Sequence, residues 1–309
     1  MPWTIIVIVV SVLAFIFLLG AIIFGCCNAT VYCKPKLIPS EREIRGNKKR
    51  GLWLDFDSYD QEEFTVEGKD GYILNCVFVS TEETRKTGKY VIICHGHTSS
   101  RYGAVKYANC YVKLGFSCII YDARTHGVNK PDTCTLGYVE SEDLKHIIDD
   151  TRAKHSDIKI LGLQGESMGS STVIHSLRFD PKVNFIVSDC CFIGSYEELY
   201  DCYKNIHLQW LTPTLWLAAK ILYKVDIKNT NSLRCLTNNK TPILFIHGAG
   251  DTLVKPFNAE MLHAKAKEEG AYTELVFVEG AGHAESRWKA GFEAYTGYIS
   301  NFLKNIGIE

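Results

Sequence analysis

Short apolar runs rich in β-branched residues recur along this chain and alternate with longer segments of helical spacing. The apolar runs occupy residues 72–79, 90–94, 116–121, 158–163, 183–188, 242–247 and 273–278. Continuous apolar runs of this length are typical of strands buried on both faces, as in a parallel sheet covered by helices. The intervening helical segments are 101–114, 139–154, 168–179, 257–269 and 288–304. The alternation predicts an α/β fold with an open, mostly parallel, doubly wound sheet.

Two segments depart from this alternation. Residues 62–67 and 72–79 come before any long helix, so we expect them to form an antiparallel hairpin at one edge of the sheet. From about 192 to 236 no strand is predicted, and aromatic and leucine side chains crowd together. This segment is predicted to be a helical insertion at the carboxyl ends of the strands, where ligands bind in such sheets. We interpret it as a lid over the site; additional core is the alternative.

The amino-terminal segment is apolar and carries no charge from Pro2 to Cys27. Spanning a bilayer core as a helix takes about 20 apolar residues, and the stretch from Trp3 to about Phe24 is long enough. A cleaved signal peptide is the main alternative, but it normally begins with basic residues and has a shorter apolar run. A bacterial lipoprotein signal ending before Cys26 is a further alternative. We predict that residues 1–27 form an uncleaved transmembrane anchor.

The chain after the anchor divides into a linker and one large domain. Residues 28–55 are polar and basic with little apolar periodicity, and residues 56–309 have the length of a single α/β domain. Between residues 31 and 50, seven Lys or Arg stand against two Glu. Basic residues beside a membrane segment tend to remain in the cytoplasm. The sequence therefore predicts a single-pass membrane protein whose large domain is cytoplasmic.

Cysteine use and net charge limit the classes of partner. The chain has 12 cysteines and no C-x-x-C pair, which suits a reducing compartment. The pair Cys26 and Cys27 beside the membrane is a candidate for acylation. With a formal net charge of −1 and no basic aromatic surface pattern, no nucleic-acid partner is predicted. No phosphate loop or dinucleotide fingerprint is present either, so no cofactor is expected.

A candidate nucleophile lies in the sequence Gly165-Glu166-Ser167-Met168-Gly169, directly after one predicted strand and directly before a helix. A G-x-S-x-G in this context forms a tight turn that projects the serine hydroxyl above the sheet. The two glycines lack a Cβ atom, which lets neighbouring backbone approach the turn. The serine then lies at a helix amino terminus, where free N–H groups favour developing negative charge. Ser167 is therefore predicted to be a catalytic nucleophile.

A serine nucleophile needs a base within hydrogen-bonding reach, and in this kind of fold the acid and then the histidine follow later strands. Asp251 lies in a glycine-rich loop after 242–247, and His283 lies in a similar loop after 273–278. We predict that His283 takes the proton of Ser167 and that Asp251 orients and stabilises the imidazole. Asp189 follows the strand 183–188 and is the competing acid; we interpret it as a structural group.

An oxyanion hole requires two N–H donors aimed at the oxygen that gains charge. One is expected from Met168, the residue after the nucleophile, and the other from His97 in the loop that follows strand 90–94. The sequence His95-Gly96-His97 is also compatible with a pair of metal ligands. Since no third ligand of suitable spacing stands nearby, we predict no metal site.

Taken together, these motifs resemble those of the α/β-hydrolase superfamily across residues 60–307, and in particular its anchored branch of lysophospholipase-like and peptidase-like proteins with an amino-terminal membrane helix. The matching motifs are H-G-H-T at 95–98, D-A-R-T-H-G at 122–127, G-E-S-M-G at 165–169, H-G-A-G-D-T-L-V at 247–254 and G-A-G-H at 280–283. The resemblance implies structural roles for Asp122 and Arg124. The family often has glycine where this chain has Thr125.

The expected activity is that of a serine hydrolase of the carboxylesterase or lipase type, acting through an acyl-enzyme on a lipophilic acyl ester or thioester. A serine peptidase or amidase with the same triad is the alternative; Ser170 and Ser171 after the motif, where peptidases of this fold often have glycine, argue mildly against it. A non-catalytic binding module on the same scaffold is the alternative from another class. The expected partners are a small acyl ester or lipid and the membrane, and the sequence indicates no oligomeric state.

Overall fold

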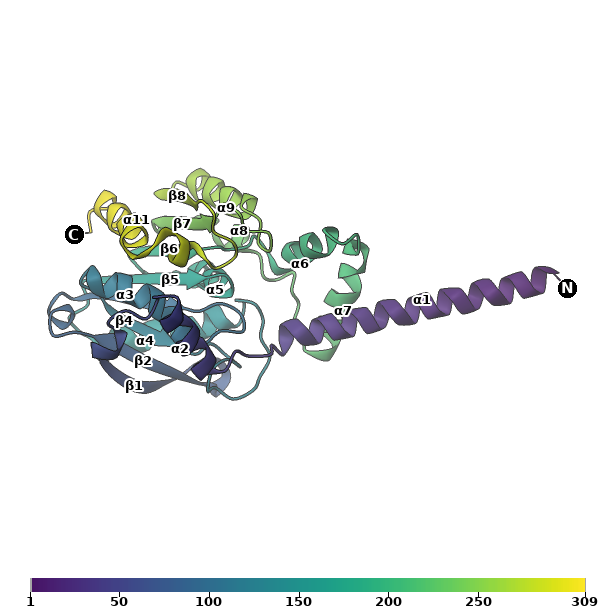
Figure 1. The fold of residues 1–309 in the computed structure, drawn as a ribbon, viewed down its shortest axis with the longest axis horizontal. Helices are drawn as coiled ribbons and strands as arrows, with labels where there is room; N and C mark the ends of the chain where they lie inside the picture. Colours follow the sequence, from purple (N-terminus) through teal and green to yellow (C-terminus); the bar gives the residue numbers. More distant parts are fainter. Residues whose placement is uncertain (1, 309) are drawn as a thin grey trace.

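The architecture is a single sheet between two layers of helices, preceded by a long projecting helix (Figure 1). The computed structural model describes residues 2–308. The eight strands lie in the order β1-β2-β4-β3-β5-β6-β7-β8. Their bounds are β1 Asp60–Glu67, β2 Ile73–Ser80, β3 Lys89–Cys94, β4 Ser117–Tyr121, β5 Ile160–Glu166, β6 Phe185–Asp189, β7 Ile243–Gly248 and β8 Thr273–Val278. All pairs from β4 to β8 are parallel, and β1 and β2 form an antiparallel hairpin at one edge.

The helices follow the alternation that the sequence predicts. Their bounds are α1 Pro2–Cys33, α2 Ser40–Lys49, α3 Val105–Lys113, α4 Glu140–Lys154, α5 Met168–Ser176, α6 Ser195–Lys204, α7 Thr212–Leu222, α8 Ser232–Cys235, α9 Phe257–Glu268, α10 Ser286–Ala290 and α11 Phe292–Asn305. The predicted α/β-hydrolase fold, with its mostly parallel, doubly wound sheet, is confirmed. The helices α6, α7 and α8 make up the insertion between β6 and β7.

Each face of the sheet has its own core. Ile92 of β3 packs in one core together with residues of α4, α5 and α9. Its neighbours Val91 and Ile93 pack in the other core, together with residues of α3 and α11. Successive side chains of a strand point to opposite faces, so a run of apolar residues such as Tyr90–Cys94 supplies both layers at once.

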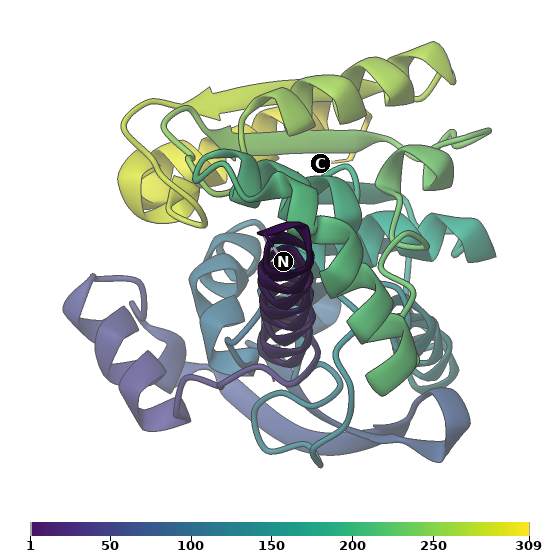
Figure 2. The same ribbon diagram turned by 90° about the vertical axis from the view of Figure 1, so that its right-hand side faces the viewer.

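The helix α1 projects from the domain, and its last turns pack on α7 (Figures 1 and 2). The stretch Trp3–Cys33 is long and apolar enough to cross a membrane, with a mean hydropathy of 3.3. The helix ends at Cys33, six residues beyond the expected end of the anchor at 27. Ala29 and Cys33 are buried against the insertion, which explains why the helix continues past its purely apolar part.

Two further details differ from the prediction. The linker contains a helix, α2, which has Glu41 in its first turn and Lys49 in its last. Charges placed in this way stabilise a helix through its dipole, but Ile44 is the only large apolar residue of α2, so the segment shows no apolar stripe by which to predict it. The predicted helix 288–304 is interrupted at Gly291, which has φ 79° and separates α10 from α11.

Candidate active site

Ser167 occupies the sharp turn between β5 and α5, with φ 53° and ψ −113°. A non-glycine residue at positive φ is strained, and such strain is typical of functional turns. The flanking glycines make the turn possible. A Cβ at Gly165 would collide with the backbone of Gly169 and Ser170, and a Cβ at Gly169 would collide with the carbonyl of Cys94. The nucleophile turn and the end of β3 are therefore in direct backbone contact.

The structure brings Ser167, His283 and Asp251 together in one chain of hydrogen bonds. Ser167 Oγ lies 2.9 Å from His283 Nε2, and His283 Nδ1 lies 2.8 Å from Asp251 Oδ2. The other carboxylate oxygen of Asp251 accepts the N–H groups of Leu253 and Val254, each at 3.0 Å. The carboxylate is thus held on one side by the loop that carries it and faces the imidazole with the other.

The electrostatics of this chain suit a general base. Burial alone would raise the pKa of Asp251, but hydrogen bonds to His247 and His283 outweigh it and lower the pKa to about 2. Burial alone would lower the pKa of His283, but the hydrogen bond and the negative charge of Asp251 outweigh it, and the pKa is raised from 6.5. Asp251 is therefore ionised at neutral pH, and its charge is placed to stabilise a protonated His283.

Asp189, the competing acid, makes no hydrogen bond to His283 among the described residues. Its carboxylate accepts the hydroxyls of Tyr295 and Ser286, each at 2.9 Å. Burial raises its pKa to about 6, and the neighbouring Glu166 adds to the shift. Its backbone carbonyl accepts the N–H of Ser167 at 2.9 Å. Asp189 thus supports the nucleophile turn from behind, as the structural interpretation expected.

Glu166 is a second buried carboxylate beside the nucleophile. It forms an ion pair with Lys106 and accepts the hydroxyl of Tyr107 at 2.5 Å. The same hydroxyl lies 3.2 Å from Asp189 Oδ2. Glu166, which directly precedes Ser167, is therefore bound to two residues of α3. These contacts hold the turn against the helices on that face of the sheet.

Two backbone N–H groups are free to bind an oxyanion. Among the hydrogen bonds of residues 2–308, none is donated by the amide of His97 or of Met168. Met168 is the first residue of α5, where an N–H has no partner within the helix. His97 lies on the loop after β3, and both residues line one cavity with Ser167. These are the two donors that the sequence predicts for the oxyanion hole.

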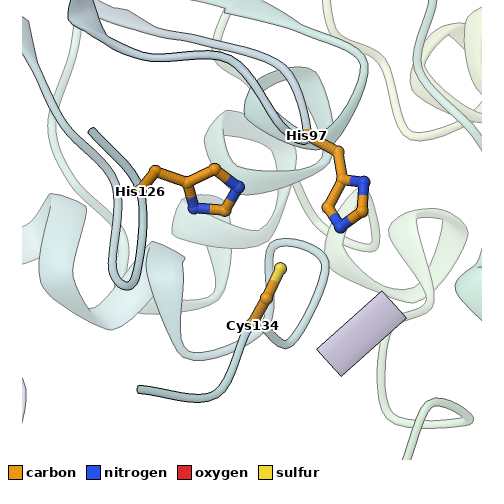
Figure 3. A group of neighbouring side chains, drawn as sticks. All are labelled: His97, His126 and Cys134. Carbon is orange, nitrogen blue, oxygen red and sulfur yellow. The ribbon is translucent and has the colours of Figure 1, made fainter. Parts of the chain in front are cut away.

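His97 also belongs to a group with His126 and Cys134, whose ligand atoms lie within 4.8 Å of one another. Figure 3 shows the three side chains converging from separate segments. The donor set does not fit a metal well. His126 Nε2 already accepts the N–H of Thr98 at 3.3 Å, and its Nδ1 donates to the carbonyl of Arg124 at 2.8 Å. This leaves two ligands, whereas zinc takes four, so we assign His126 the role of fastening the loop that carries His97.

The apolar cavity above Ser167 has a volume of about 100 Å³. Its walls combine the nucleophile turn, the insertion and the last turn of α1. The lining residues are Tyr32, His97, Leu136, Ser167, Met168, Phe192, Ser195, Glu198, Leu199, Cys202, Leu253, Val254 and His283. A mainly apolar cavity that ends at a nucleophile is suited to an acyl chain or an apolar side chain.

Glu198 of α6 is the one carboxylate on that cavity wall. Burial raises its pKa to about 7, and Cys202 Sγ donates to it at 3.4 Å. No Lys or Arg forms an ion pair with it within residues 2–308. Neither Glu198 nor Tyr32 was predicted as a site residue. Both lie in segments whose spatial position depends on tertiary packing, so no local motif marks them.

A second and more polar cavity of about 710 Å³ meets the site from the side of α2. It reaches Ser167 and His283 and is also lined by charged side chains, among them Arg42, Arg50 and Lys106. Ser167 therefore lies between an apolar cavity beside the insertion and a polar cavity beside α2. This arrangement suits a substrate with an apolar part and a polar part.

Asp122 and Arg124 are buried and structural. Arg124 pairs with Asp143 at 2.8 Å, while Asp122 accepts the N–H of Arg101 at 2.7 Å. Thr125, where the superfamily often has glycine, has φ 64°, a conformation that suits glycine and strains a β-branched residue. Its hydroxyl accepts the N–H of Asp132 at 3.0 Å, which helps to hold the threonine in this position.

Comparisons with known proteins place the chain in a family and show its fold. The model of the prolyl oligopeptidase family (Peptidase_S9) matches residues 136–307, more than half of the chain, including Ser167, Asp251 and His283. The uncharacterized protein YqkD of Bacillus subtilis (strain 168) is 28% identical over 259 residues, which cover 81% of this chain and 83% of YqkD.

Two solved structures show the same fold. The Pyrococcus furiosus esterase Pf2001 superposes with a TM-score of 0.69 at 21% identity, covering 89% of this chain and 98% of the esterase. The Pyrococcus horikoshii acylaminoacyl peptidase superposes with a TM-score of 0.62 at 14% identity, covering 81% of this chain and 42% of the peptidase.

Proposed function

The chain belongs to the prolyl oligopeptidase family within the α/β-hydrolase superfamily of serine hydrolases, and we propose that it cleaves esters or thioesters of lipophilic acyl groups, as a lysophospholipase-like carboxylesterase does. The observation that carries this proposal is the apolar cavity that ends at Ser167 and His283. The acyl chain occupies this cavity, and the alcohol or thiol half of the substrate extends into the polar cavity beside α2.

The mechanism follows from the hydrogen-bond chain. As Ser167 Oγ attacks the acyl carbon, its proton passes to His283 Nε2 and the imidazolium is stabilised by Asp251. The N–H groups of His97 and Met168 donate to the oxyanion, and each such donor is worth roughly 3–4 kcal/mol. His283 then returns the proton to the leaving oxygen or sulfur. A water molecule, activated by the same histidine, hydrolyses the acyl-enzyme and regenerates Ser167.

We also propose that α1 anchors the protein in a membrane as a single span, with the catalytic domain on the cytoplasmic side. The support for the span is the length and apolar character of Trp3–Cys33. The support for the orientation is the excess of Lys and Arg in the linker.

A second candidate activity is the hydrolysis of an amide or peptide bond by the same triad. Family membership favours it, because the matching family is one of peptidases by name. Glu198 favours it as well, since an unpaired carboxylate in the cavity would attract the ammonium group of an aminoacyl substrate. The apolar character of the remaining wall leads us to prefer the ester.

The proposal is tested with the full chain in detergent. Turnover of p-nitrophenyl esters of increasing acyl length is compared with that of aminoacyl p-nitroanilides, each beside Ser167→Ala. We expect ester turnover that is lost in the variant, and the acyl length of fastest turnover reports how long a chain the apolar cavity accepts. Turnover of the anilides alone would favour the second candidate, and an unchanged rate in Ser167→Ala would exclude the triad mechanism.

A further inference from the structure

The insertion has exposed apolar residues that take no part in lining the catalytic cavity. We call these residues the outer lid face. It consists of Ile206, Trp210, Leu217, Ile221 and Leu222, whose exposed fractions lie between 49% and 60%. On the side of α7 opposite Leu217 and Ile221, Leu215 and Ala219 are almost fully buried. The helix α7 therefore has more apolar residues than the protein interior buries. An exposed apolar patch of this kind marks an interaction surface.

The partner of this face is indicated by α1, which runs beside α7 in the same direction. The ring of Phe17 stacks on Trp210 with centroids 5.2 Å apart and an interplanar angle of 8°. Further along, Gly25 lies against the backbone of Thr214, and Thr30 Oγ1 lies 2.7 Å from the hydroxyl of Tyr223. Figures 1 and 2 show the two helices side by side.

These contacts fix the depth of the insertion relative to the membrane. A span takes about 20 residues, and every 20-residue span that fits in the uncharged stretch from Trp3 to Cys27 includes Phe17. At a rise of 1.5 Å per residue, Phe17 lies about 10 Å before Phe24, towards the amino terminus. Trp210, stacked on Phe17, is therefore placed at the depth of the acyl chains, about 10 Å inside the expected end of the span at Phe24.

The lysines of the insertion agree with this placement. Lys204 at the end of α6, Lys220 on α7 and Lys224 after it are exposed, and Lys220 is also paired with Asp226 at 2.7 Å. Long cationic side chains at such positions reach the headgroup layer while their stems remain on apolar surface. An anionic headgroup layer attracts an unpaired lysine near the surface by about 1 kcal/mol.

We propose that the outer lid face is seated in the lipid bilayer beside α1, so that the catalytic cavity receives its acyl substrate from the membrane. The same insertion supplies Leu199 and Cys202 to the cavity wall, and α1 supplies Tyr32. The elements that meet the lipid are thus the elements that roof the cavity. The second half of this inference rests on the proposed function, whereas the seating itself depends only on α1 crossing the membrane.

The seating is tested by the quenching of tryptophan fluorescence in vesicles whose phosphatidylcholine carries brominated acyl chains. The full chain with Trp3→Phe serves as the parent, because Trp3 lies in the span itself. We expect brominated lipid to quench the parent and the quenched fraction to fall at least by half in Trp210→Phe. Trp288→Phe, which removes a half-exposed tryptophan of the catalytic domain, is the matched control and should not lower the quenched fraction. Equal quenching in the parent and in Trp210→Phe would overturn the seating.

The supply of substrate from the membrane is tested by activity. In Leu217→Asn/Ile221→Asn, we expect turnover of a long-chain ester embedded in vesicles to fall at least fivefold, while turnover of a short, water-soluble ester stays within twofold. Val128→Asn, which changes an equally exposed apolar residue elsewhere, should alter neither. An equal effect on both substrates would overturn this part of the inference. If no ester is hydrolysed but brominated lipid still quenches Trp210, the proposed esterase function is wrong, whereas the placement of the outer lid face in the bilayer is supported.

Discussion

Tyr32 of α1 and Ser167 of the nucleophile turn line the same cavity. The amino-terminal helix is therefore a wall of the candidate active site as well as the proposed membrane anchor. Its carboxyl-terminal turns share a buried cluster with the insertion, to which Ala29 and Cys33 of α1 and Leu199 and Leu215 of the insertion belong. A chain that begins after α1 would lack this wall and expose the cluster, so activity is best measured on the full chain.

The contact between α1 and α7 provides a test of this coupling. A Cβ at Gly25 would lie 2.5 Å from the backbone oxygen of Thr214, whereas a Cβ at Gly20 would meet no atom within 4 Å. We expect Gly25→Leu to cost about 1–3 kcal/mol of stability through overpacking and to reduce turnover of long-chain esters. Gly20→Leu should change neither. Thermal unfolding and ester turnover in one detergent measure both effects, and equal behaviour of the two variants would contradict a packed interface.

The pH dependence of turnover reports the partnership of Asp251 and His283. His283 must be neutral to accept a proton, and its pKa is raised from 6.5 by Asp251. Turnover is therefore expected to fall as the pH drops, with the midpoint above 6.5. In Asp251→Asn the charge is lost while burial, which lowers the pKa, remains. The midpoint should move to lower pH and kcat should fall by about 10⁴. A midpoint that stays in place would assign the titration to another group.

The backbone contact at Gly169 tests the oxyanion geometry without altering a side chain of the triad. Gly169→Ala would drive its Cβ into the carbonyl of Cys94 and shift the loop that carries His97. Because one oxyanion donor is worth about 10²–10³ in rate, we expect kcat to fall by about that factor. Gly297→Ala is the control: Gly297 lies within α11 with no atom within 4 Å of the added Cβ. Alanine there should leave kcat unchanged and stabilise the helix by about 0.5–1 kcal/mol. Comparable kcat values in Gly169→Ala and Gly297→Ala would contradict an oxyanion hole formed by the N–H groups of His97 and Met168.

Glu198 makes substrate binding depend on pH. Its pKa is raised to about 7 by burial, so its charge appears in the apolar cavity as the pH rises through that value. For a neutral long-chain ester, we expect KM to increase above pH 7 in the parent and to stay flat in Glu198→Gln. A cationic aminoacyl substrate should show the opposite trend. Parallel KM profiles for both proteins would show that Glu198 does not face the bound substrate.

The sequence predicts the sheet well because two local signals identify its strands. These signals are the continuous apolar runs and the glycine-rich loops that follow several of them. The run before Cys94 and the G-x-S-x-G around Ser167 are local signals, and the structure has a strand and a strand-to-helix turn at these places. The loop positions of Asp251 and His283 follow from the same logic, and the structure places both within hydrogen-bonding distance of their expected partners.

The features that sequence did not predict depend on contacts between distant segments. Tyr32 becomes a cavity residue only because α1 continues to Cys33 and packs on the insertion. In the sequence, Glu198 is an ordinary polar position of a helix, and only the packing of α6 in the fold places it on the wall of the cavity that contains Ser167. Two other differences are local. The helix α2 is marked by the charges at its ends and not by an apolar stripe, and Gly291 is a single glycine within a segment of otherwise helical spacing. Apolar periodicity, on which the prediction relied, does not detect either of them.

The central claim is that Ser167 is the nucleophile, and the most direct measurement is the mapping of a covalent adduct. The full chain is treated with a fluorophosphonate, digested and analysed by mass spectrometry, beside Ser167→Ala and His283→Ala. We predict one adduct per chain on Ser167, none in Ser167→Ala and slow labelling in His283→Ala, since the base activates the hydroxyl. A folded protein that takes up no label, or an adduct on another residue that persists in Ser167→Ala, would contradict the account.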